Sequence, residues 1–91
     1  MDKIIVYSMV GCPYCTELKD LLDDSGIEYI DRDVKKYEEE WEVIMGETNN
    51  EFIPTVIIAN EKTGNGRVLI PDVDFDDIPD CFTKIVDYIT R

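Results

Sequence analysis

A chain of 91 residues with 44% hydrophobic residues is long enough for one domain with a modest core, so we expect residues 1–91 to form a single domain. The formal net charge of −12 leaves no basic stripe on the surface, and we therefore expect no nucleic acid and no anionic membrane as a partner. The lack of histidine excludes Ser-His and Cys-His catalysis and most zinc sites.

The cysteine content favours a reducing compartment. The chain holds three cysteines, and so small and odd a number does not suit a disulfide-stapled secreted fold. The apolar run near the N-terminus is too short for a signal peptide, and no stretch approaches the roughly 20 apolar residues of a membrane span. We therefore expect a cytoplasmic protein.

The first part of the chain predicts a strand, a helix and a second strand. Residues 3–8 are rich in β-branched and aromatic side chains, which is typical of a buried strand. A helix is predicted over residues 13–24, with Pro13 in its first turn and Gly26 ending it in a left-handed conformation. Residues 27–33 then predict the second strand.

An apolar stripe at helical spacing predicts a second helix over residues 35–45. The members of the stripe are Tyr37, Trp41, Ile44 and Met45. We interpret them as core residues rather than as a platform for a ligand. Gly46 is expected to close this helix, and residues 47–51 are expected to form a loop.

The last part of the chain predicts a hairpin and a helix. Residues 52–59 read as a third strand with Pro54 at its entrance, where a missing N–H is tolerated. A turn over residues 60–66 leads into a fourth strand at residues 67–70. Asp77 is the expected N-cap of the final helix.

The elements follow the order β-α-β-α-β-β-α. The first half is a right-handed parallel crossover, and the second half adds an antiparallel hairpin. Helices on both faces would bury a four-stranded mixed sheet. The fold class predicted from the pattern is α/β.

The tetrapeptide Cys12-Pro13-Tyr14-Cys15 lies where the first strand gives way to the first helix. Backbone N–H groups at a helix start have no intrahelical partner, and their aligned dipoles favour a negative charge. We therefore expect a thiolate at Cys12 to be stabilised and to act as the attacking group. Cys15, nearly one turn further on, faces the same side and can resolve a mixed disulfide.

With this tetrapeptide, with Ile53-Pro54 and with its order of elements, the chain resembles a glutaredoxin of the thioredoxin superfamily, including compact viral forms. The resemblance implies a thioredoxin-like fold and a cis peptide bond before Pro54. It also implies that Cys12 is the nucleophile and Cys15 the resolving thiol. The substrate-binding residues that it implies are Tyr14, Ile53, Pro54, Asp76 and Asp77. Among these, Ile53 would offer its backbone N–H and C=O to the substrate as an added strand does.

The resemblance implies a dithiol thiol–disulfide oxidoreductase without a bound cofactor. It would reduce protein disulfides or glutathione mixed disulfides, with glutathione as the reductant and ribonucleotide reductase as one kind of client. A thioredoxin-like carrier reduced by a flavoprotein such as thioredoxin reductase is the alternative within the same chemistry. A noncatalytic acidic docking module of the same fold is the alternative from another class. We expect a monomer.

Two departures from the resemblance concern glutathione. Met9 stands where many glutaredoxins have Lys or Arg, and residues 70–77 lack the Gly-Gly pair that many have after the hairpin. The carboxylates in residues 70–77 should repel anionic glutathione unless backbone donors and Lys19 offset them. This departure favours the thioredoxin-like alternative.

No metal site is expected. Cys12, Cys15 and Cys81 supply three soft ligands, whereas structural zinc takes four. Iron–sulfur clusters shared between two chains occur in relatives that usually lack the proline of this tetrapeptide. The acidic residues 72–77 lack the spacing of a calcium-binding EF-hand. Cys81, next to Phe82, is interpreted as a small buried hydrophobe, with a regulatory thiol as the minority interpretation.

Overall fold

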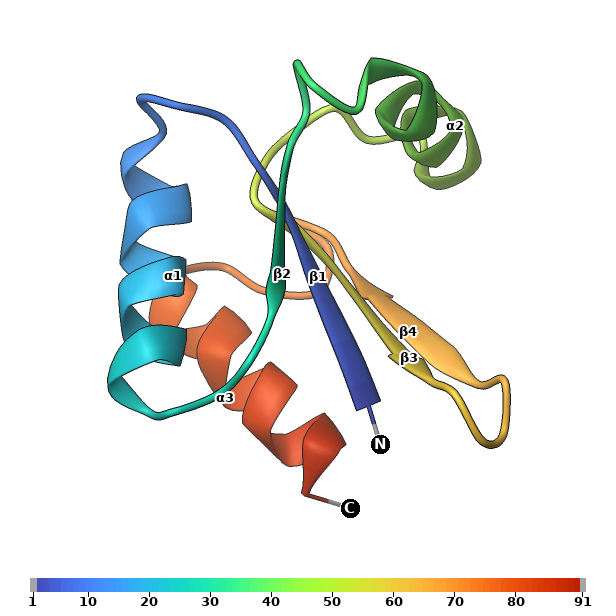
Figure 1. The fold of residues 1–91 in the computed structure, drawn as a ribbon. Helices are drawn as coiled ribbons and strands as arrows, with labels where there is room; N and C mark the ends of the chain where they lie inside the picture. Colours follow the sequence, from blue (N-terminus) through green and yellow to red (C-terminus); the bar gives the residue numbers. More distant parts are fainter. Residues whose placement is uncertain (1, 91) are drawn as a thin grey trace.

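The computed structural model describes residues 2–90 and confirms the α/β class. A single four-stranded sheet carries three helices (Figure 1). The elements are β1 (Asp2–Ser8), α1 (Pro13–Asp24), β2 (Ile30–Asp33), α2 (Glu38–Thr48), β3 (Thr55–Asn60), β4 (Gly66–Leu69) and α3 (Ile78–Ile89). Their order is the one that the sequence predicts.

The sheet has the strand order β2-β1-β3-β4 and is mixed. β1 pairs in parallel with β2 and antiparallel with β3, and β3 and β4 form the antiparallel hairpin. Helices α1 and α3 lie together on one face, and α2 lies on the other (Figure 1). None of the described helices is long and apolar enough to span a membrane.

Alternation along β1 divides the core into two layers. Val6 points into the larger layer, where it meets Leu18 and Leu22 of α1 and Ile85 of α3. Tyr7 points to the opposite face and packs on Trp41 of α2, with ring centroids 5.6 Å apart. Because both faces are covered, the strand ends and the loops that follow them are what remains available for a site.

The bounds of α1 are those that the sequence predicts. Leu18 and Leu22 are fully buried on its inner face. Ser25 caps the helix, and Gly26 follows with a φ of +69°, a conformation that glycine adopts at no steric cost. The N-cap of α3 is also as predicted, since the Asp77 carboxylate accepts the Asp80 N–H at 2.8 Å.

The prediction for the second helix was wrong at both ends. Residues 35–37 form a turn in which the Lys36 and Tyr37 N–H groups both donate to the Asp33 carbonyl at 3.0 Å. The helix continues through Gly46, and Asn49, with a φ of +58°, ends it in the left-handed conformation. Tyr37 is 43% exposed and therefore lies outside the core, unlike Trp41.

Two strands begin later than predicted. The Ile27 N–H donates to the Leu22 carbonyl at 3.0 Å, which ties this residue to the end of α1, and β2 begins only at Ile30. β3 begins only at Thr55, the residue after Pro54, which has no N–H to donate to a neighbouring strand.

Candidate active site

Cys12 is the N-cap residue of α1 and is partly exposed. Its Sγ accepts a hydrogen bond from the Cys15 N–H at 3.2 Å. Its carbonyl accepts the Thr16 N–H, also at 3.2 Å, which is the first bond of the helix. The sulfur therefore takes the place of a capping oxygen, where donated N–H groups and the helix dipole favour a negative charge.

The loop before Cys12 brings the sulfur to this position. The Cys12 N–H donates to the Met9 carbonyl at 3.2 Å, which closes a tight turn. Gly11 lies inside this turn with a φ of +86°, so the turn requires a residue without a Cβ. Pro13 follows in the first turn of the helix, where its missing N–H leaves no bond unmade.

Cys15 lies behind Cys12 and is only 1% exposed. Burial, together with the hydrogen bond with Cys12, raises the pKa of its thiol to about 12. Cys15 is therefore a protonated thiol held next to an accessible sulfur. The two cysteines therefore differ in exposure, Cys12 being partly exposed and Cys15 buried.

Residues 50–54, which precede β3, contribute a second segment to the candidate site. The Thr55 hydroxyl donates to the Phe52 carbonyl at 2.8 Å, and the Asn50 amide side chain binds both the N–H and the carbonyl of Phe52 at 3.3 Å. These bonds hold Phe52, which lies two residues before the cis Pro54. The cis bond that the resemblance implies is present.

A groove of about 430 Å³ lies between these segments and the start of α3. All five residues to which the resemblance assigns substrate binding line it, namely Tyr14, Ile53, Pro54, Asp76 and Asp77. The sequence interpretation missed five further lining residues, which are Phe52, Pro71, Asp72, Phe75 and Ile78. The only sequence signal for Phe52 is an aromatic residue just before the Ile53-Pro54 pair.

The groove is acidic. It is lined by three carboxylates, those of Asp72, Asp76 and Asp77, and among residues 2–90 no Lys or Arg lines it. Lys19 does not fill this gap, because its ammonium lies 3.2 Å from the Asp31 carboxylate. Lys19 does lower the pKa of Cys15 slightly, against the larger effect of burial.

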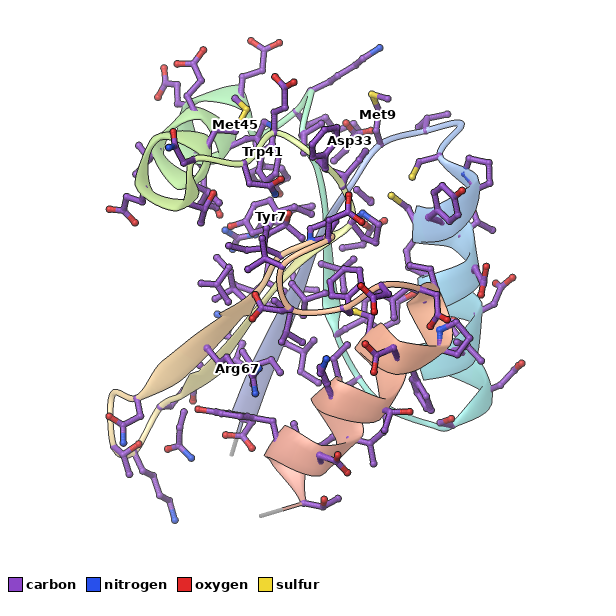
Figure 2. The ribbon with its side chains drawn as sticks, turned by 180° about the vertical axis from the view of Figure 1, so that it is seen from behind. Tyr7, Met9, Asp33, Trp41, Met45 and Arg67 are labelled. Carbon is purple, nitrogen blue, oxygen red and sulfur yellow. The ribbon has the colours of Figure 1, made fainter. Side chains whose placement is uncertain are left out.

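The sequence analysis did not predict a polar cluster between α2 and the sheet, which consists of Tyr7, Arg32 and Glu40. Figure 2 shows Tyr7 beside Trp41, between the sheet and α2. The Tyr7 hydroxyl donates to the Glu40 carboxylate, which also accepts from Arg32. Burial, together with the neighbouring Glu40, raises the pKa of Tyr7 to about 12. These residues anchor α2 to the sheet and do not line the groove.

The third cysteine lies apart from the dithiol. Cys81 is fully buried in α3 among the residues of the larger core layer, as the interpretation as a small hydrophobe predicts. Burial raises its pKa to about 12. Among residues 2–90, no group of three His, Cys, Asp or Glu side chains is placed to hold a metal ion.

A dithiol at the start of the helix after β1, together with a cis proline before β3, defines the thioredoxin-like class of proteins. The glutaredoxin family model matches residues 4–62, which is more than half of the chain. The chain belongs to the glutaredoxin family of the thioredoxin superfamily. Members of this family are thiol–disulfide oxidoreductases.

Individual relatives agree with this assignment. The chain is 33% identical over 66 residues to glutaredoxin 1 of Rickettsia conorii, a match that covers 70% of this chain and 65% of that protein. A thioredoxin-like protein of known crystal structure is 28% identical, with a TM-score of 0.55 over 71% of this chain and 84% of that one. The buckwheat glutaredoxin in its complex with glutathione is 18% identical, with a TM-score of 0.63 over 96% and 71%, which shows the fold. The chain spans just under two thirds of the length of the first of these relatives.

Proposed function

We propose that this chain is a dithiol thiol–disulfide oxidoreductase, with Cys12 as the nucleophile and Cys15 as the resolving thiol. The observation that carries the proposal is the pairing of two different thiols. The Cys12 sulfur is partly exposed and accepts a hydrogen bond from the Cys15 backbone N–H, whereas the Cys15 thiol beside it is buried. Membership of the glutaredoxin family supports it.

The reaction follows from the two sulfurs. The Cys12 thiolate attacks one sulfur of a substrate disulfide, so that a Cys12–substrate disulfide forms and the other substrate sulfur leaves as a thiolate. Cys15 then gives up its proton and attacks the Cys12 sulfur, which forms the Cys12–Cys15 disulfide and releases the second substrate thiol. The substrate gains two electrons, and the protein loses them.

The groove is the proposed substrate site. An extended substrate segment would pair with the backbone N–H and C=O of Ile53, next to the cis Pro54, as an added strand. Tyr14 would form one wall, and Asp76 and Asp77 would form the opposite wall. The convergence of these residues from three separate segments on one groove supports this placement.

Two electron donors are proposed as alternatives, glutathione and a flavoprotein reductase. Glutathione is the reductant of the family, and the buckwheat glutaredoxin with the same fold is in complex with it. The acidic groove supports the alternative, a flavoprotein such as thioredoxin reductase. The proposed clients are disulfide-containing proteins, with ribonucleotide reductase as one example. The chain itself is proposed to be a single-domain monomer in the cytoplasm, where free thiols persist.

The test is turnover of a low-molecular-weight disulfide with two coupled donors. One assay contains glutathione, glutathione reductase and NADPH, and the other contains thioredoxin reductase and NADPH. We expect NADPH consumption with at least one donor, its loss in Cys12→Ser, and its retention in Cys81→Ala, which removes a cysteine outside the site. Turnover with neither donor would leave the acidic docking module as the function.

A further inference from the structure

The lining of the groove combines two kinds of side chain. Two exposed aromatic rings belong to it, Tyr14 at 64% and Phe52 at 59% exposure. The exposed residues Asp72, Asp76 and Asp77 belong to it as well. Aromatic faces and carboxylates share one preferred ligand, an organic cation.

The backbone around the groove holds two of these residues in place. The Asp72 N–H donates to the Phe75 carbonyl at 2.9 Å, and Asp72 has a φ of +65° in this tight turn. Asp77 is held by its capping bond to Asp80. Within residues 2–90, the carboxylates of Asp72 and Asp76 have no hydrogen bond or ion pair to another group.

The nearest basic side chains are paired elsewhere. Arg67 lies 3.8 Å from Asp74, and Figure 2 shows it on the part of β4 remote from Met9, which closes the turn before Cys12. Lys84 binds the Asp74 carbonyl and lies 3.1 Å from Asp80. Lys19 is paired with Asp31, and among residues 2–90 no Lys or Arg forms an ion pair with Asp72 or Asp76.

We propose that the preferred substrate of this groove is a protein segment in which Lys or Arg lies close to the disulfide that Cys12 attacks. The inference rests on the proposed function and names its substrate class. The basic side chain would enter the groove between the two aromatic rings and the carboxylates while the substrate sulfur faces Cys12. The bond changes are those of the exchange above, and the substrate itself is the oxidant.

The same charges explain why a protein segment fits better than glutathione. Glutathione has two carboxylates and one ammonium group, so it is anionic at neutral pH. It would place negative charge against the three carboxylates that line the groove. A basic peptide replaces this repulsion with attraction.

The test is a single-turnover oxidation of the fully reduced protein by three short disulfide-linked peptides. The peptides are identical except for the two residues that flank each cysteine, which are Lys, Ser or Glu. Each rate is divided by the rate of the same peptide with dithiothreitol, so that the intrinsic reactivity of the disulfide cancels. Rapid acid quenching and chromatography give the amount of peptide thiol released.

We expect the Lys peptide to react about tenfold faster than the Glu peptide at low salt, which is what a few weak surface charge interactions amount to. The ratio should shrink in about 0.5 M salt, because exposed charges are then screened. The variant Asp72→Asn/Asp76→Asn should bring the ratio to within about twofold, since it removes two of the three groove carboxylates. Asparagine also tolerates the positive φ at position 72.

The matched control is Asp24→Asn/Asp87→Asn. It removes the same charge from two exposed positions near the C-terminal ends of α1 and α3, away from the groove at their N-terminal ends. This variant should keep the preference of the parent protein. Equal rates for all three peptides, or equal loss of preference in both variants, would overturn the inference and leave the proposed function standing. Failure to react with any peptide would overturn the proposed function and this inference with it.

Discussion

Alkylation at neutral pH should separate the three cysteines. Cys12 is partly exposed, whereas Cys15 and Cys81 are buried. Burial raises the pKa of both buried thiols from the ordinary 9.0 to about 12. Because only the thiolate attacks an alkylating agent, the buried thiols should be nearly inert in the folded protein.

The expected size of the effect follows from the shift. At about pH 7.5, a thiol with a pKa of 9.0 is about 3% ionised, and one with a pKa of about 12 is about 0.003% ionised. Cys15 should therefore react about a thousandfold more slowly than an ordinary thiol, before its burial slows it further.

The assay is timed treatment of the reduced protein with iodoacetamide, followed by peptide mapping by mass spectrometry. We expect label on Cys12 alone in the folded protein and on all three cysteines in urea. The Cys15→Ser variant should keep the labelling rate of Cys12 within a few-fold. Labelling of Cys15 in the folded protein at a rate similar to that of Cys12 would refute the division of roles between an accessible and a buried thiol.

Three further predictions concern stability, measured by urea unfolding. Burial raises the pKa of Cys81, so its stabilising contribution is present below pH 9 and falls as the pH rises toward 12. Between about pH 7 and pH 10 the free energy of unfolding of the parent should therefore fall by roughly 1 kcal/mol more than that of Cys81→Ala, and an equal fall in both would contradict this. Leu22→Ala should cost about 2 to 5 kcal/mol, because the side chain is fully buried under the sheet; a cost below 1 kcal/mol would contradict this packing. Asp77→Ala should cost about 1 kcal/mol by removing the cap of α3, and Asp77→Asn should restore most of it.

The sequence predicted the helix ends that are marked by a proline, a glycine or a capping residue. For α1, Pro13 and Gly26 mark the ends, and both act in the structure as their backbone preferences require. The start of α3 is predicted equally well because Asp77 caps it. For α2 the available signal, Gly46, misled, since a glycine is tolerated inside a helix and Asn49 provides the left-handed end instead.

The residues that line the groove could not be predicted together from local sequence patterns. Its walls come from the start of α1, the segment before β3 and the segment between β4 and α3, which only the folded sheet brings together. The resemblance supplied Tyr14 and Ile53, whereas Phe52, which lies one residue before Ile53, was assigned to a strand. Asp72 reads in the sequence as one acid among many, and only its position at the groove gives it a role.

The most direct test of the account is the identity of the sulfur that carries the substrate. Cys15→Ser, mixed with a disulfide peptide, should accumulate one covalent adduct, and mass spectrometry after digestion should place it on Cys12. A thiol reductant should release the adduct, and Cys12→Ser should form none. An adduct that accumulates in Cys12→Ser and is absent from Cys15→Ser would contradict the assignment of Cys12 as the attacking sulfur.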